Sequence, residues 1–135
     1  MATPITVNRA PDYTDLDLDF MVNPRTNQLI LQTGVDAIKR SVRNLIFTNN
    51  FERPFQSYIG SGIRSFLFEN YGPLTTIALQ DQIKLTLSQF EPRITLDDVI
   101  VTEDLDNNGF SVTIQYHINN TSMPIVTSLF LERIR

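Results

Sequence analysis

The change from helix to strand in this chain falls at residues 91–93, which read Glu91-Pro92-Arg93. Before this tripeptide, apolar residues recur at steps of three and four, as on the buried face of a helix. After it, they alternate with polar residues, as on a half-buried strand. Pro92 disfavours a helical backbone at the residue before it, so we expect the preceding helix to end here. The sequence therefore predicts an α+β fold in which central helices pack on a small antiparallel C-terminal sheet.

Apolar periodicity predicts helices in the middle of the chain. The first begins near Thr33 and ends around residues 48–50. Its apolar stripe consists of Val35, Ile38, Val42, Leu45 and Ile46. A short helix is predicted over residues 63–68. The next begins at Pro73, which suits a first helical turn because its missing N–H group would have no partner there. The core-facing stripe of that helix consists of Leu79, Ile83, Leu87 and Phe90.

Strict alternation predicts strands near both ends of the chain. Residues 15–20 read Asp-Leu-Asp-Leu-Asp-Phe, which indicates a strand whose apolar face carries Leu16, Leu18 and Phe20. Residues 23–27 read Asn-Pro-Arg-Thr-Asn, which is typical of a turn. Toward the C-terminus, strands are predicted over residues 99–102, 110–119 and 125–131. A tight hairpin turn is predicted at residues 106–109, because the Asn-Gly pair that ends this segment tolerates positive φ.

Composition narrows the range of functions. We expect an N-terminal arm over residues 1–14 and a single domain over residues 15–135. The formal net charge is −4 and no Lys/Arg-rich run occurs, so neither nucleic acid nor an anionic membrane is a favoured partner. We find no apolar run long enough for a transmembrane helix and no secretory-signal pattern. Cysteine is absent, which excludes disulfides, thiolate metal sites and a cysteine nucleophile.

The titratable residues do not form the patterns of a metal or nucleophile site. His117 is expected on the polar face of the strand over residues 110–119, exposed to solvent or to a partner, with no nucleophile motif to serve. The aspartates at positions 15, 17 and 19 resemble part of a calcium loop, but its sixth and twelfth positions hold Phe20 and Thr26 instead of Gly and Glu. Residues 104–108 lack the final Glu as well. We therefore expect no metal and no cofactor.

Glycoside hydrolysis would need two carboxyl groups, and Glu52, Glu69 and Glu91 are the candidates. Arg53 adjoins the first of them, and Arg93 is two residues from the last. A neighbouring arginine lowers the pKa of a carboxyl group, whereas a general acid needs it raised. The residues therefore disfavour hydrolysis.

Glu91 and Arg93 admit two interpretations. The first is a surface ion pair beside a helix end, which contributes about 0–1 kcal/mol to stability. The second is an arginine fork that the rigid proline corner presents to the carboxylate or backbone of a partner. The chemistry of the pair favours the first and leaves the second open.

Several short motifs occur in a specific order along this chain. They are Asn23-Pro24, Leu45-Ile46-Phe47-Thr48, Glu52-Arg53-Pro54-Phe55, Gly60-Ser61, Leu67-Phe68-Glu69 and Glu91-Pro92-Arg93. In this order the chain resembles, over roughly residues 15–135, the phage baseplate wedge proteins that initiate tail sheaths. That family is shared with the baseplate of type VI secretion systems, and T-even-type myovirus members look most similar in length. The glycine that the family usually has before the first Glu-Arg pair is Phe51 here.

The resemblance implies a structural, non-enzymatic protein of the virion, located in the tail baseplate and assembled in the host cytoplasm. It implies binding to a helix bundle of larger wedge proteins through Glu91, Pro92 and Arg93, with residues 52–53 as further partner contacts. It also implies a C-terminal sheet like the connecting domain of the sheath protein, to which sheath subunits add strands. Thr127 and Leu129 are expected at that docking edge. Tail tube or hub proteins are further partners that the resemblance leaves open. Whether the arm contacts the tail tube or a wedge protein also stays open, and a tail-associated, lysozyme-like glycoside hydrolase is the alternative function.

Overall fold

A computed structural model describes residues 13–119, 121 and 123–133. The chain forms two compact units, Met1–Ile38 and Lys39–Arg135, and the predicted arm over residues 1–14 lies almost entirely outside the described residues. In the first unit, β1 (Thr14–Leu16) pairs antiparallel with β2 (Leu31–Thr33). The turn predicted at residues 23–27 is confirmed, since the Asn23 N–H group donates to the Gln28 carbonyl oxygen at 2.9 Å.

The strand predicted over residues 15–20 is confirmed only at residues 15 and 16 and is wrong beyond them. β1 ends at Leu16, and the expected apolar face is exposed at all three positions, Leu16, Leu18 and Phe20. Asp17 ends the strand: its side chain accepts from the Asp19 N–H group at 3.4 Å and its carbonyl oxygen from the Phe20 N–H group at 3.1 Å. Aspartate forms such local turns readily, and here the turn competes with strand pairing. Phe20, the last residue of this turn, has a positive φ of 51°.

The predicted helices are confirmed, with small changes at their ends. They are α1 (Gly34–Phe47), α2 (Ile63–Phe66) and α3 (Pro73–Phe90). The stripe of α3 is buried at Leu79, Ile83 and Leu87, and that of α1 at Val42, Leu45 and Ile46. Val35 and Phe90, at the ends of the two predicted stripes, are 39% exposed and half-buried respectively. Among the described residues, no helix is long and apolar enough to cross a bilayer.

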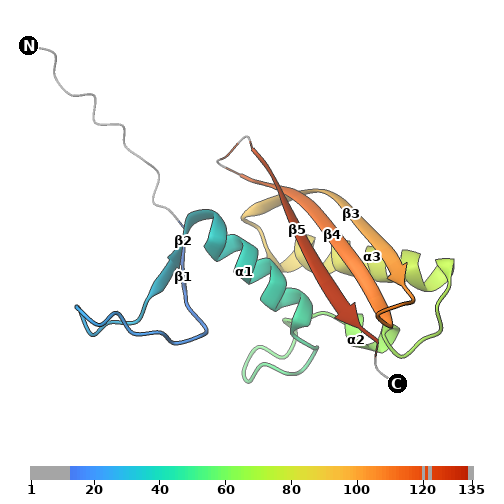
Figure 1. Cartoon of the computed structure of the whole chain (residues 1–135), viewed down its shortest axis with the longest axis horizontal. Helices are drawn as coiled ribbons and strands as arrows, with labels where there is room; N and C mark the ends of the chain where they lie inside the picture. The colour runs from blue at the N-terminus through green and yellow to red at the C-terminus, as the bar shows by residue number, and fades with distance from the viewer. Residues whose placement is uncertain (1–12, 120, 122, 134–135) are drawn as a thin grey trace, which may run out of the picture. The chain divides into compact units, whose positions relative to one another are not determined.

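An antiparallel sheet follows the helices, in the order β3-β4-β5. Its strands are β3 (Ile94–Asp104), β4 (Gly109–Ile118) and β5 (Pro124–Glu132), so β3 begins five residues earlier than the predicted start at residue 99. Alternate residues of β4 are buried, which confirms its predicted apolar face; they are Phe110, Val112, Ile114, Tyr116 and Ile118. α3 runs along the sheet and packs against β3 (Figure 1). The predicted fold class is thereby confirmed.

The hairpin turn between β3 and β4 is confirmed, but Asn108 and Gly109 have different roles in it. Asn108 adopts the positive φ, at 52°, whereas Gly109 is the first residue of β4. A Cβ atom on Gly109 would lie 2.5 Å from the carbonyl oxygen of Leu131 and still closer to the ring of Phe130. Glycine is therefore required here because β5 approaches the backbone of β4 closely.

We predict that Gly109→Ala lowers the free energy of unfolding by about 1–3 kcal/mol, because overpacking forces backbone and side chains to move. Denaturant-induced unfolding measures the difference. Gly72→Ala is the matched control, since a Cβ atom there meets no other atom within 4 Å. Equal stability losses in the two variants would contradict the assignment of a close approach at Gly109.

Candidate functional site

Glu91 lies at the point where α3 ends and β3 is about to begin. Its N–H group donates to the Leu87 carbonyl oxygen at 3.0 Å, which closes the last turn of α3. Its side chain is only 3% exposed. The carboxylate accepts hydrogen bonds from Arg93 Nε at 2.6 Å and Arg93 Nη2 at 2.9 Å, and from Ser41 Oγ at 2.6 Å. We name Ser41, Glu91, Pro92 and Arg93 the Glu91 corner.

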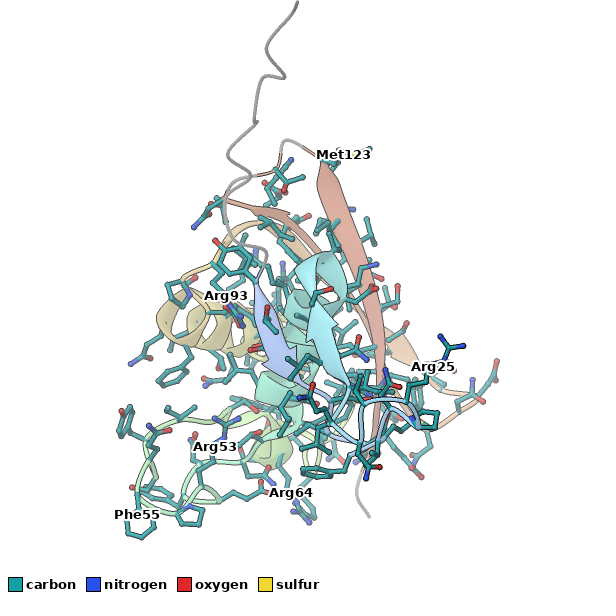
Figure 2. The ribbon with its side chains drawn as sticks, turned by 90° about the vertical axis from the view of Figure 1, so that its left-hand side faces the viewer. Arg25, Arg53, Phe55, Arg64, Arg93 and Met123 are labelled. Atoms are coloured by element: carbon teal, nitrogen blue, oxygen red, sulfur yellow. The ribbon has the colours of Figure 1, made fainter. Side chains whose placement is uncertain are left out.

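The Glu91 corner connects parts of the second unit that are distant in sequence. Ser41 belongs to α1 and lies 50 residues before Glu91. The Pro92 carbonyl oxygen accepts from Asn119 Nδ2 at 2.8 Å, and the Arg93 carbonyl oxygen accepts from the Asn119 N–H group at 3.1 Å. The corner therefore ties α1, α3 and the end of the β3–β4 ladder together. Figure 2 labels Arg93 beside α3.

The interpretation of a surface ion pair is wrong, because the carboxylate is buried. The pair is a bidentate, charge-assisted contact of the kind that positions groups strongly. The Nε–Nη2 edge of Arg93 is directed at Glu91, so a partner carboxylate would have to displace Glu91 to use that edge. Arg93→Ala would leave a buried carboxylate without its cation, and loss of folding would then accompany any loss of binding.

The electrostatics of the corner keep Glu91 ionised. Burial raises the pKa of Glu91. The hydrogen bonds from Arg93 and Ser41 and the charge of Arg93 together lower the pKa by more than burial raises it, so the pKa is below its usual 4.5. A general acid must instead retain its proton near neutral pH. This carboxyl group is therefore unsuited to protonate a leaving group.

The loop between α1 and α2 places the other predicted charged pair. The Glu52 carboxylate accepts from the Asn49 N–H group at 2.8 Å and from Asn49 Nδ2 at 3.2 Å, so it holds the loop's first turn. Arg53 follows in the same loop and is exposed. Ser61 is buried, its Oγ donates to the Ile46 carbonyl oxygen at 2.6 Å, and its backbone forms an isolated parallel β-bridge with Asn49.

Two phenylalanines of this loop were not predicted as site residues. Phe51 and Phe55 have positive φ values of 67° and 66°, and their side chains are 83% and 104% exposed. Figure 2 shows Phe55 at the outer tip of the loop. A left-handed backbone costs a non-glycine residue about 1–2 kcal/mol. The available signal was Phe51 itself, which occupies the position where the resembled family has glycine.

Of the remaining titratable candidates, His117 and Asp104 make local contacts. His117 Nδ1 lies 2.5 Å from Asp97 Oδ2 on the polar face of the sheet, and both side chains are partly exposed. Asp104 accepts from the Asn107 N–H group at 3.1 Å and Nδ2 at 2.8 Å, and these bonds lower the pKa of Asp104. Glu69 is exposed. Within the described ranges, no group of three or more His, Asp or Glu side chains is arranged to hold a metal ion.

The two edges of the sheet differ in chemistry. β3 has a bulge between Leu96 and Asp98 and carries Asp97, Asp98, Glu103 and Asp104. Charges and bulges are the usual protection of an edge strand against pairing with another chain. β5 carries no charge between Pro124 and Leu131. In Figure 1 it is the outer strand of the sheet, and it pairs only with β4 among the described residues.

The register of the β4–β5 ladder shows which groups of β5 face outward. The Arg133 N–H group donates to the Asn108 carbonyl oxygen at 2.9 Å, which adds a hydrogen-bonded pair beyond the last pair of the ladder. Because hydrogen-bonded and non-hydrogen-bonded pairs alternate, odd-numbered residues of β5 bond to β4. Even-numbered residues direct their N–H and C=O groups away from the sheet. Those within the strand are Pro124, Val126, Ser128, Phe130 and Glu132, and all of them except Pro124 have an N–H group to donate.

The predicted docking residues Thr127 and Leu129 are odd-numbered and bond toward β4. Leu129 is buried, and Thr127 Oγ1 lies 3.1 Å from the hydroxyl oxygen of Tyr116, a contact that holds the strand in place. The structure thus places both residues in the edge strand, while the backbone groups available to a new strand belong to their neighbours.

Comparisons with known proteins support one family. The pattern of the family described as baseplate wedge protein gp25 matches residues 32–123. Baseplate wedge protein gp25 of Enterobacteria phage T4 is 28% identical over 106 residues, which cover 78% of this chain and 80% of that protein.

Solved structures share the fold. A chain in the baseplate of the anti-feeding prophage is 22% identical, with a TM-score of 0.64 over 92% of this chain and 88% of that chain. A protein of Geobacter sulfurreducens described as a candidate tail lysozyme is 24% identical, with a TM-score of 0.66 over 78% of this chain and 97% of that chain.

We predict that Glu91→Gln lowers the free energy of unfolding by about 2 kcal/mol at neutral pH, because hydrogen bonds to charged groups contribute roughly 1.5–3 kcal/mol. The folded-state pKa of Glu91 is lowered, so its contribution is complete above the unfolded pKa and is lost as pH falls through the folded one. The variant should lack this acid-dependent loss. Urea unfolding across acidic pH measures both effects, with Glu69→Gln as the exposed control. Indistinguishable pH profiles for the two variants would contradict this role of Glu91.

Proposed function

Because the chain belongs to the baseplate wedge protein gp25 family, we propose that it is a structural subunit of the baseplate wedge of a contractile tail. The single observation that carries this proposal is the family match over residues 32–123, which includes all of the Glu91 corner and the loop between α1 and α2. The related wedge protein of phage T4 and the related chain in the anti-feeding prophage baseplate support the same kind of assembly.

The first specific role is binding to helices of larger wedge proteins. In this role the Glu91 corner has a positioning function: Glu91, Pro92 and Arg93 set the geometry of the surface, and their own contacts are internal. The loop supplies the direct contact. Arginine and aromatic residues are enriched at protein–protein interfaces, and Arg53 and Phe55 are of these types. Glu52 holds the loop through Asn49, and a partner would cover aromatic surface that is otherwise in water.

The second specific role is the initiation of the tail sheath by strand addition to β5. Main-chain hydrogen bonds from Val126, Ser128 and Phe130 would supply the affinity. The protected edge at β3 limits addition to one side of the sheet, which would give each wedge a single docking direction for the first sheath ring. We also propose that the chain is part of the virion baseplate and is assembled in the host cytoplasm.

The competing function is a lysozyme-like hydrolase. The lowered pKa of Glu91 disfavours a general acid at that position, and Glu52 is committed to the loop turn. We therefore propose that the protein has no hydrolytic role. Release of soluble sugar fragments from peptidoglycan by the purified chain, with loss of release in Glu52→Gln, would support the hydrolase instead.

The wedge role predicts that Arg53→Ala combined with Phe55→Ala preserves folding and reduces co-purification with the larger wedge proteins at least tenfold, which corresponds to about 1.4 kcal/mol. Both side chains lie on an exposed loop, so thermal unfolding should stay within a few degrees of the parent. Ile77→Ala, at a position on α3 that is 55% exposed, is the control that should bind normally. Normal recovery of wedge proteins with the double variant would remove the loop from the interface.

The sheath role predicts different outcomes for prolines at neighbouring positions of β5. Ser128→Pro removes an outward N–H group and should leave a folded chain that joins baseplates but does not support sheath polymerisation. Thr127→Pro removes a bond to β4 and should destabilise the chain by about 3 kcal/mol, the cost of a proline within a hydrogen-bonded element.

Electron microscopy of assembled particles and thermal unfolding measure these outcomes. Ser128→Thr keeps the N–H group and is the matched control, which should polymerise sheath normally. Sheath growth on baseplates that carry Ser128→Pro would rule out strand addition at this edge.

A further inference from the structure

A hollow of about 250 Å³ lies at the C-terminal end of β5, between this strand, the end of α1 and α2. Apolar side chains form most of its wall, and polar groups such as Glu132 lie beside them. The apolar residues are Ile46, Phe47, Ile63, Leu67 and Leu131. All of them belong to the unit Lys39–Arg135.

The walls of the hollow are well fixed. Ile46, Ile63 and Leu131 are each 2% exposed, so they are held by the core. Phe47 is different, because 47% of its side chain is exposed while it lines the same hollow. The apolar wall of the hollow suits an apolar side chain that enters from the surface. The polar and charged residues at its rim suit the polar backbone to which that side chain is attached.

The position of the hollow relates it to the sheet edge. Among the described residues that line it, the strand residues come from β5 and from neither β3 nor β4. A strand added to β5 would lie about 4.8 Å from it, with side chains alternating between the two faces. Those that share the face of Leu129 and Leu131 point toward the helices. In an antiparallel strand that bonds to Phe130, the residue opposite Phe130 shares the outer face of the sheet. The neighbouring residue, opposite Leu131, would place its side chain at the hollow.

We propose that this hollow is a specificity pocket that receives one large apolar side chain, such as leucine or phenylalanine, from the strand that adds to β5. Pockets for small molecules usually measure roughly 300–1,000 Å³, and this one is smaller. Main-chain bonds along a strand carry little sequence information, and pockets for alternate side chains supply it. The pocket would thereby fix the register of the incoming strand. This inference rests on the proposed sheath role and adds to it the chemistry of the partner segment.

Photo-crosslinking tests the proposal on assembled baseplates with the sheath protein of the same virus as the probe. The crosslinking amino acid p-benzoylphenylalanine replaces Phe47 in one variant and Ser128 in a second. Phe68, which is 55% exposed and does not line the hollow, is the control position. Mass spectrometry then identifies the residue attached. The proposal expects both Phe47 and Ser128 to crosslink to one sheath segment, with a large apolar residue opposite Phe47.

The outcomes separate the two proposals. Crosslinking to the sheath from Ser128 but not from Phe47 overturns the pocket and leaves strand addition intact. Absence of sheath crosslinks from both positions overturns strand addition and the pocket together. Crosslinking from Phe47 to a wedge protein or to a second copy of this chain also overturns the pocket. As a quantitative readout, Phe47→Trp should crowd the pocket and weaken sheath retention about tenfold, whereas Phe68→Trp should not change it.

Discussion

The buried carboxylate of Glu91 is the contact on which the rest of this unit depends. It receives Arg93 from the start of the sheet and Ser41 from α1, and it follows directly on α3. A buried charge is tolerated only when it is paired and hydrogen-bonded. Each of these elements must therefore stay in place for the charge to remain satisfied, and the corner acts as a fixed joint between helices and sheet.

The same joint allows the outer parts of the unit to carry locally unfavourable features. With α1 and α3 held, the loop after α1 can present two exposed phenylalanines in left-handed conformations. The exposure of the aromatic rings and the left-handed backbone are each unfavourable in an isolated chain. The energy comes from the surrounding fold, which overdetermines the loop through Asn49 and Ser61. Such local strain beside exposed aromatic surface is consistent with a protein that is completed by its partners.

The sheet shows a comparable division. β3 is protected by acidic residues and a bulge, whereas β5 is uncharged over most of its length. An unprotected edge is a hazard for a free protein, because it invites unspecific pairing. In an assembly that grows in one direction, a difference between the two edges of the sheet is useful, because it restricts strand addition to β5. An apolar hollow at the end of β5 is consistent with the same use, since it would restrict which strands fit.

Local periodicity by itself determined the helices, the β3–β4 hairpin, the buried face of β4 and the break at Pro92, because these depend on neighbours in the chain. It failed at residues 17–20, where the Asp17 turn outcompeted alternation. Only the tertiary structure decided that Glu91 is buried, because its partner Ser41 is 50 residues away. Likewise, the outward groups of β5 follow from its register with β4, and the hollow from the meeting of β5 with α1 and α2. Sequence patterns describe which side of an element is apolar, but which distant group meets that side is set by packing in three dimensions.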